Sequence, residues 1–291
     1  MKCLYILLVS VLCALSPRAF AQPPRLADTL APGTPFFFVQ ISDPQLGFRE
    51  EGGVAEGERL LRETVAAINL LCPSFVIVTG DMVNNPDDEA QFAAYRRLID
   101  SIRPDVPVFH LPGNHDMGKF SESRLRDYLA RYGYDRFSFR FGGCAFLGID
   151  SCPIKDGVSA AEESQYDWLC AQLEAAKECR ERILFLHCPI ILTERHEPET
   201  YSNFPEPMRR RYISLLKRYA VRYVFAGHLH NTAQAETEGI RMITCGPSGR
   251  PLGTGYSGMN IITVTADTID VQYVRPSEAR RPFLPGDPDV R

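Results

Sequence analysis

Five short segments of the chain end in residues whose side chains commonly bind metal ions. Four of the five follow directly on a run rich in Val, Ile or Phe. Since open α/β sheets bind ligands at the carboxyl ends of their strands, we expect these side chains to meet at one edge of a sheet. The segments are Asp43-Pro44-Gln45, Gly80-Asp81-Met82-Val83-Asn84, Gly113-Asn114-His115-Asp116, His187 within 185–189, and Gly227-His228-Leu229-His230.

The donor atoms in these segments suit transition metals. Carboxylate, amide and imidazole groups in one site favour Mn, Fe or Zn over Ca. His228 and His230 stand at positions i and i+2 of an extended segment, so both imidazoles point to the same side. Two metal ions held about 3.5–4 Å apart can bind one phosphoryl group and ready a water molecule for attack. The carboxylate of Asp81 is placed to bridge two such ions.

The third segment combines a neutral ligand with two residues suited to acid–base chemistry. Asn114 offers an amide oxygen to a metal, and the adjacent His115 can face the substrate. Asp116 can orient the imidazole of His115. We therefore expect His115 and Asp116 to be catalytic.

Other candidate residues have a plainer interpretation. A histidine such as His187, directly after an apolar run, is often a core residue when it stands alone. His110 lies inside a predicted strand and is interpreted as structural, whereas His196 in a polar loop either contacts substrate or is solvated. Most of the basic candidates for phosphate contact are expected to be surface charges. They are Arg49, Lys119, Arg195 and Arg209-Arg210-Arg211.

The beginning of the chain predicts a secretory signal peptide at residues 1–21. Lys2 precedes the apolar run Leu4–Leu15, and Ala19-Phe20-Ala21 supplies small residues before a cleavage site. The apolar run is too short to span a membrane. Before Cys13, the segment Ser10-Val11-Leu12 has a bulky Leu where a small residue usually precedes a lipidated cysteine, so we expect no lipoprotein anchor. A secreted or periplasmic protein follows from this pattern.

Composition narrows the class of protein further. With 32 basic and 36 acidic residues the formal net charge is −4, which argues against broad nucleic-acid binding. No later apolar run is long enough to predict a membrane span. The nine cysteines include no Cys-x-x-Cys, so we expect no disulfide scaffold, although an oxidising compartment permits one or two bridges. Cys170 and Cys179 are expected on one helix, roughly 13 Å apart and too distant to bridge. The oligomeric state is not predicted.

Predicted strands and helices alternate at first, and the end of the chain is rich in strands. This order favours an α/β fold with a two-sheet β-sandwich flanked by helices, in four α/β/β/α layers. We expect a flexible lead-in at 22–34, one domain at 35–275 and a C-terminal tail at 276–291. Strands are predicted at 36–41, 75–79, 106–111, 137–141, 144–149, 183–186, 221–225, 232–236, 241–245, 260–265 and 268–273, and helices at 56–71, 87–102, 122–132, 162–179 and 207–219.

Together the five segments resemble the calcineurin-like metallophosphoesterase family, over roughly residues 36–273. The resemblance implies a hydrolase of phosphoric esters that uses two metal ions, with His115 near the leaving-group oxygen. It implies that one ion is bound by Asp43, Gln45, Asp81 and His230, and the other by Asp81, Asn114, His187 and His228.

Gln45 departs from the family pattern, because most members have His at this position. An amide oxygen binds a transition metal more weakly than imidazole does, so we expect a weaker first site. The form Asp43-Pro44-Gln45-x-Gly47-Phe48 resembles the branch of calcineurin-like phosphoesterase domain-containing proteins, some of which are serine/threonine phosphatases. We expect a phosphatase acting on small molecules or phosphoproteins. A phosphodiesterase remains an alternative, and the pocket wall formed by the loops 46–57, 152–161 and 193–206 decides between the two reactions. A non-catalytic phosphate- or metal-binding protein is a second alternative, which only Gln45 supports.

Overall fold

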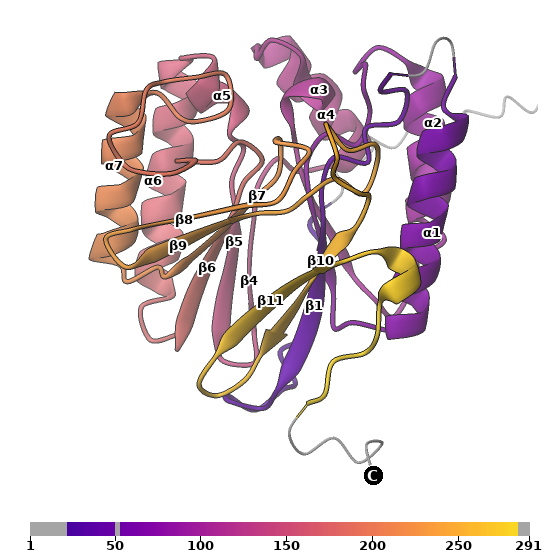
Figure 1. Ribbon diagram of the computed structural model, residues 1–291. Helices are drawn as coiled ribbons and strands as arrows, with labels where there is room; N and C mark the ends of the chain where they lie inside the picture. Colours follow the sequence, from indigo (N-terminus) through magenta and orange to yellow (C-terminus); the bar gives the residue numbers. More distant parts are fainter. Residues whose placement is uncertain (1–21, 50–52, 285–291) are drawn as a thin grey trace, which may run out of the picture.

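The computed structural model describes residues 22–49 and 53–284 of the 291-residue chain. The predicted signal peptide at 1–21 lies outside the described residues. Within them the chain forms two mixed β-sheets covered by helices, as predicted (Figure 1).

The first sheet contains the beginning and the end of the domain. Its strands are β1 (Phe36–Ile41), β2 (Val76–Thr79), β3 (Val108–Leu111), β10 (Met259–Val264) and β11 (Ile269–Val274). Across the sheet they follow the order β11-β10-β1-β2-β3. β1, β2 and β3 run parallel, so their carboxyl ends share one edge of the sheet.

The second sheet is built from the middle of the chain. Its strands are β4 (Phe137–Phe141), β5 (Cys144–Gly148), β6 (Glu181–Phe185), β7 (Tyr223–Ala226), β8 (Ala233–Thr237) and β9 (Ile240–Thr244). Their order is β4-β5-β6-β7-β9-β8, and β5, β6, β7 and β9 run parallel. This sheet therefore also gathers several carboxyl ends at one edge.

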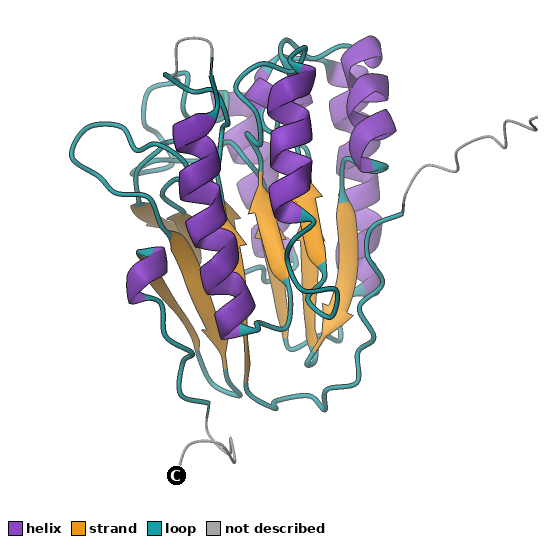
Figure 2. Cartoon of the chain, turned by 90° about the vertical axis from the view of Figure 1, so that its right-hand side faces the viewer, coloured by secondary structure: helices purple, strands orange, loops and turns teal. Residues whose placement is uncertain are grey.

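Helices cover the outer face of each sheet and give the four predicted layers. The longer helices are α1 (Ala55–Leu71), α2 (Glu89–Ile99), α4 (Glu122–Tyr132), α6 (Ser159–Ala175) and α7 (Glu206–Arg218). Figure 1 shows α1 and α2 on the right beside the first sheet and α6 and α7 on the left beside the second, and Figure 2 shows helices in front of the strands. Short helices are α3 (Asn114–Met117), α5 (Cys152–Lys155) and the 3₁₀ turn η1 (Pro276–Glu278).

The helices pack on the sheets through apolar faces with helical spacing. In α1 the buried residues include Leu61, Val65 and Ile68, which recur every three or four positions and face the strands of the first sheet. The helix ends where Cys72 adopts a left-handed backbone with φ of 51°. In α2, Asp88 caps the first turn by accepting hydrogen bonds from backbone N–H groups.

A layer of phenylalanine rings joins the two sheets. The ring of Phe38 on β1 lies 4.8 Å from that of Phe75, 5.5 Å from Phe146 and 6.0 Å from Phe185 on the facing sheet. These side chains are fully buried. Aromatic pairs at such separations add stability beyond the burial of their surface, so this layer sets how the two sheets lie against each other.

The structure corrects several predicted boundaries. The helix predicted at 162–179 ends at Ala175, and the Arg182 side chain donates to the backbone carbonyls of Lys177 and Cys179 in the turn that follows it. Cys179 lies in this turn, so the prediction that Cys170 and Cys179 share one helix is wrong. The seven cysteines of the described residues are all unpaired. The short helices α3 and α5 were not predicted.

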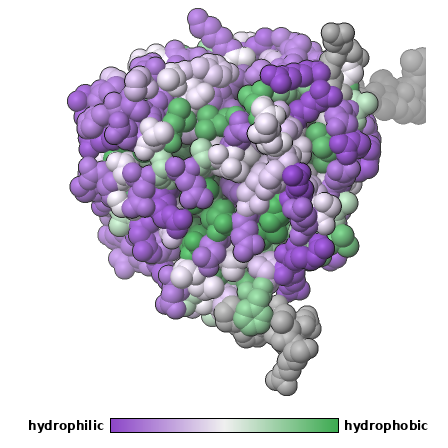
Figure 3. All heavy atoms as spheres, in the orientation of Figure 1, coloured by the Kyte–Doolittle hydropathy of each residue, from purple (hydrophilic) through white to green (hydrophobic). Residues whose placement is uncertain are grey.

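On the face of the molecule in Figure 3, hydrophilic residues predominate and apolar residues form small separate areas. Among the described residues no helix has the length and apolar character needed to span a membrane.

In the lead-in, Leu26 and Leu30 pack against the buried layer between the sheets, and Asp28 accepts a hydrogen bond from the backbone of Gly142.

We predict that Phe38→Ala lowers the free energy of unfolding by about 3–5 kcal/mol, because it leaves a cavity between the sheets. Urea denaturation measures this change. Phe283→Ala is the matched control, since Phe283 is 65% exposed. An equal effect of the two substitutions would contradict the role given to the phenylalanine layer.

Candidate metal centre

The five sequence segments meet at one edge of the sandwich, as predicted. Asp43 follows β1, Asp81 follows β2 and Asn114 follows β3 in the first sheet. His187 follows β6 and His228 follows β7 in the second. Because these strands are parallel within each sheet, their carboxyl ends place acidic groups from one sheet opposite imidazoles from the other.

Backbone conformation at this edge is unusual. Nine described residues other than glycine have positive φ, and the site holds five of them. This region is sparsely populated by residues with a side chain, and such strain concentrates at functional sites. The five are Asp43 at 49°, Gln45 at 36°, Asp81 at 52°, His228 at 75° and His230 at 51°.

Two glycines allow the segments to approach closely. A Cβ on Gly113 would lie 2.1 Å from Oδ1 of Asp81, and one on Gly227 would lie 1.8 Å from Oγ of Ser42. Neither separation is possible between nonbonded atoms. Glycine at these two positions is therefore required for the loops after β3 and β7 to pass the acidic side chains.

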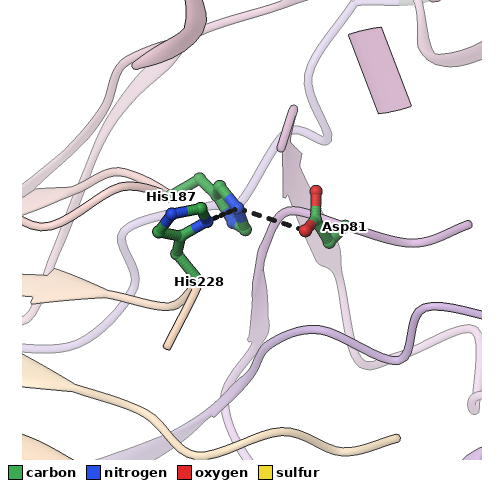
Figure 4. Close-up of side chains that lie close together, drawn as sticks. All are labelled: Asp81, His187 and His228. Carbon is green, nitrogen blue, oxygen red and sulfur yellow. Dashed lines mark hydrogen bonds and ion pairs between the residues drawn. The ribbon is translucent and has the colours of Figure 1, made fainter. Parts of the chain in front are cut away.

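Asp81, His187 and His228 form the tightest group of donor atoms. One ligand atom from each lies within 4.8 Å of the others. His187 lies between the other two side chains, with Nε2 at 3.3 Å from Oδ2 of Asp81 and 3.1 Å from Nδ1 of His228 (Figure 4). Oδ1 of Asn114 lies 3.1 Å from the same Nε2. Four donor atoms thus surround one small space.

Hydrogen bonding fixes which nitrogen of His187 faces this space. Nδ1 lies 2.8 Å from the backbone carbonyl of Thr79 and donates to it. Nε2 is then the nitrogen that faces the carboxylate of Asp81 and the amide oxygen of Asn114. A proton on Nε2 lets the ring donate to Asp81, and a metal ion that replaced this proton would be bound by the Nε2 lone pair together with the two oxygens.

Asp43 and His230 form a second group of donor atoms. Nδ1 of His230 donates to the carbonyl of Arg250 at 2.7 Å, which leaves Nε2 facing Oδ1 of Asp43 at 3.7 Å. Asp43 is fully buried and accepts hydrogen bonds from the Ser42 hydroxyl and the backbone N–H of His228. These contacts hold the carboxylate in place.

Gln45 fits a ligand role. Its side chain is 2% exposed, and Nε2 donates to Oδ1 of Asn84 at 3.2 Å. Oε1 is buried without a hydrogen-bond partner. A buried amide oxygen left unpaired is unfavourable by about 1–3 kcal/mol, and a cation would satisfy it. The donor set of this structure therefore fits two metal ions.

Electrostatics favour positive charge at this edge. Burial raises the pKa of Asp43. Burial alone would lower the pKa of His187. The carboxylates of Asp81 and Asp43 have a larger effect than burial and raise the pKa of His187 to about 10. Burial likewise opposes ionisation of Asp81, yet His187 holds its pKa well below the usual range. Burial and the nearby His187 lower the pKa of His228 to about 3. The two carboxylates thus create a field that attracts a cation.

The predicted roles of His115 and Asp116 are only partly compatible with the geometry. Nδ1 of His115 lies 2.8 Å from the carbonyl of Asn84, so this carbonyl orients the ring. The carboxylate of Asp116 accepts hydrogen bonds from the backbone N–H groups of Met82 and Gly113, both at 2.8 Å. The prediction that Asp116 orients the imidazole is wrong. Asp116 is the third residue of α3 and folds back to cap that helix.

Most of the other candidates have structural contacts. His110 is buried on β3 against the rings of Tyr95 and Tyr132, and burial lowers its pKa to about 3. His196 and Lys119 are exposed. Arg195 in its loop and the three consecutive arginines of α7 bind residues that are not among the predicted ligands. Arg195 pairs with Glu238, Arg210 with Glu206 and Arg211 with Glu162, and Arg209 donates to the backbone of Glu197.

Arg49 remains a candidate phosphate contact. Its guanidinium lies 5.2 Å from the ring of Phe48, and that ring lies 4.8 Å from the ring of His230. The loop that follows β1 therefore brings a positive charge toward the Asp43 side of the centre.

A cavity of about 250 Å³ opens beside Asn114, His187 and His228. Two of the three loops expected to form the pocket wall contribute to it. Sequence reasoning missed Tyr201 in this wall and the orienting carbonyls of Thr79, Asn84 and Arg250. The other residues that line the cavity are Gly118, Ser151, Cys152, Lys155, Asp156, Cys188 and Tyr201.

Comparison with known proteins agrees with this geometry. A family model described as calcineurin-like phosphoesterase matches residues 38–232. The serine/threonine-protein phosphatase CPPED1 of Mus musculus is 31% identical over 260 residues, covering 82% of this chain and 83% of the relative. A cAMP/cGMP dual specificity phosphodiesterase of Mycobacterium tuberculosis is 26% identical over 270 residues, covering 84% and 81%.

A solved structure shares the fold. The crystal structure of a dimetal phosphatase from Danio rerio superposes with a TM-score of 0.64 at 16% sequence identity, covering 83% of this chain and 96% of the other. The two-sheet sandwich, the edge where five strand ends meet and the match to most of the domain agree with one another. The chain therefore belongs to the calcineurin-like phosphoesterase family and is a metal-dependent phosphoesterase.

Proposed function

We propose that this protein is a phosphatase that hydrolyses phosphomonoesters, of small molecules or of phosphoproteins, with two metal ions bound at the strand edge. The observation that carries the proposal is the convergence of buried donor atoms from Asp81, His187 and His228 within 4.8 Å of one another. The 31% identity to a serine/threonine-protein phosphatase supports the monoester class.

The proposed ligands form two groups that share Asp81. The first ion would be held by Asp43, Gln45, Asp81 and His230, and the second by Asp81, Asn114, His187 and His228. Such ions act as Lewis acids on the phosphoryl group and activate a water molecule. Mn, Fe and Zn all suit this mixture of carboxylate, amide and imidazole donors. The unpaired oxygen of Gln45 supports its place in the first group.

His115 is the proposed proton donor to the leaving group. Its backbone N–H donates to Oδ1 of Asp81 at 2.8 Å, which ties its position to the metal centre. Since Nδ1 donates to the carbonyl of Asn84, Nε2 is the nitrogen left to exchange a proton with substrate. Asp116 supports this arrangement by holding the backbone of Met82 and Gly113.

Phosphodiester hydrolysis is the alternative that a specific comparison favours. The Mycobacterium tuberculosis phosphodiesterase matches 84% of this chain at 26% identity. The donor groups would serve either reaction, so the wall of the 250 Å³ cavity decides which esters enter.

The proposed location is the periplasm or the extracellular space. Its support is the pattern of residues 1–21, in which a basic residue, an apolar run and small residues succeed one another.

We predict that metal controls turnover and that monoesters are the better substrates. Chelation should abolish hydrolysis of p-nitrophenyl phosphate, and added Mn²⁺ should restore it. The same assay with bis-p-nitrophenyl phosphate should give slower turnover. Asp81→Asn should be inactive, whereas the control Asp127→Asn on the exposed face of α4 should match the native protein.

Faster hydrolysis of the diester would favour the alternative reaction. No turnover of either ester with Mn²⁺, Fe²⁺ or Zn²⁺ would indicate a non-catalytic binding protein. Full activity of the chelated protein would refute the metal-dependent mechanism.

We predict that His115→Ala retains bound metal but slows esters with poor leaving groups, such as alkyl phosphates, by about 10²–10⁴-fold. Nitrophenyl esters should lose less, because nitrophenolate departs without a proton. Kinetics on both ester types and metal analysis of the purified variant measure these effects. His196→Ala is the control, since His196 is exposed. An equal loss for both esters would make His115 a charge-stabilising residue instead.

A further inference from the structure

Tyr201 contacts two of the proposed ligands from a loop far away in the sequence. Its hydroxyl accepts a hydrogen bond from Nδ2 of Asn114 at 2.8 Å, and its ring centroid lies 4.8 Å from that of His228. The side chain is nevertheless 68% exposed. An aromatic residue this exposed, yet bonded to the centre, calls for a functional explanation.

The contact with Asn114 determines which end of the amide faces the centre. Nδ2 is taken by the Tyr201 hydroxyl, and Oδ1 lies 3.1 Å from Nε2 of His187. Only the amide oxygen has lone pairs to offer a cation. The hydrogen bond at the nitrogen end therefore holds the oxygen in the position that a ligand must occupy.

Hydrogen bonds within the loop at residues 192–204 hold the backbone that carries the exposed Tyr201. The carboxylate of Glu197 is buried within the loop and accepts hydrogen bonds from the backbone of Leu192 and Thr193, both at 2.7 Å. The side-chain amide of Asn203 donates to the same carboxylate at 2.6 Å. This internal network links the beginning of the loop to Asn203, two residues after Tyr201.

A second contact fastens the loop to the cavity wall. Nζ of Lys155 in α5 donates to the backbone carbonyl of Thr200 at 2.9 Å and to that of Asn203. These carbonyls flank Tyr201 on either side in the sequence. Lys155 thus connects the loop tip to the helix that lines the same cavity.

We propose that Tyr201 is a positioning residue of the metal centre, whose hydroxyl fixes the amide of Asn114 so that Oδ1 coordinates the second ion. The proposal rests on the proposed function, in which Asn114 is a ligand. Groups that hydrogen-bond to metal ligands typically change metal affinity by 10–100-fold when they are removed.

The test is titration calorimetry of Mn²⁺ into the metal-free protein and its variants. Tyr201→Phe removes the hydroxyl and keeps the ring, and should weaken the tighter Mn²⁺ site about 10-fold or more. Turnover should recover at saturating Mn²⁺. Tyr219→Phe at the end of α7 is the matched control and should bind Mn²⁺ like the native protein.

Asn114→Ala and the double variant separate this inference from the proposed function. Asn114→Ala should weaken Mn²⁺ binding, and adding Tyr201→Phe to it should weaken binding no further, because the hydroxyl acts only through the amide. Unchanged Mn²⁺ affinity in Tyr201→Phe, with weakened affinity in Asn114→Ala, would overturn this inference alone. Unchanged affinity in Asn114→Ala would overturn the ligand assignment as well.

Thermal denaturation of the metal-free variants excludes a merely structural role. Because Tyr201 is exposed, Tyr201→Phe should leave the melting temperature of the metal-free protein unchanged. A lowered melting temperature together with weakened Mn²⁺ binding would show that the hydroxyl supports the fold, and would overturn the positioning role.

Discussion

The pairing of Asp81 with His187 joins the two sheets at the functional edge. Asp81 comes from the first sheet and His187 from the second, and Oδ2 lies 3.3 Å from Nε2 with both side chains at most 2% exposed. A carboxylate buried this deeply needs charged or hydrogen-bonding partners. The His115 backbone N–H and the His187 ring supply them, and the other donor groups surround this pair.

The backbone carries strain to achieve this arrangement. Gln45, His228 and His230 adopt positive φ, which residues with long or branched side chains seldom do. Such strain persists only where the surrounding structure over-determines it. The buried phenylalanine layer between the sheets and the close passage of Gly113 and Gly227 provide that constraint. The buried layer between the sheets thus stabilises the strained backbone that carries the predicted metal ligands.

Much of the architecture could be predicted, because apolar runs locate strands and parallel strands share an edge. That rule places Asp43 and Asp81 together, and His187 joins them because the second sheet packs against the first with its strand ends at the same edge. The long-range contacts of Asp116 and Tyr201 could not be predicted. Besides the local cap at Gly113, Asp116 accepts from a backbone group 34 residues away, and Tyr201 contacts a side chain 87 residues away, and no local pattern encodes these two contacts. The end of the helix at Ala175 was also not predicted, and the turn after it is held by side-chain contacts of Arg182.

The central claim is that two ions share the Asp81 carboxylate. Anomalous X-ray diffraction from crystals soaked in Mn²⁺ tests it most directly. We expect two Mn peaks about 3.5–4 Å apart on either side of Asp81, one beside Asp43 and His230 and the other beside His187 and His228. A single peak, or peaks that do not contact Asp81, would contradict the account.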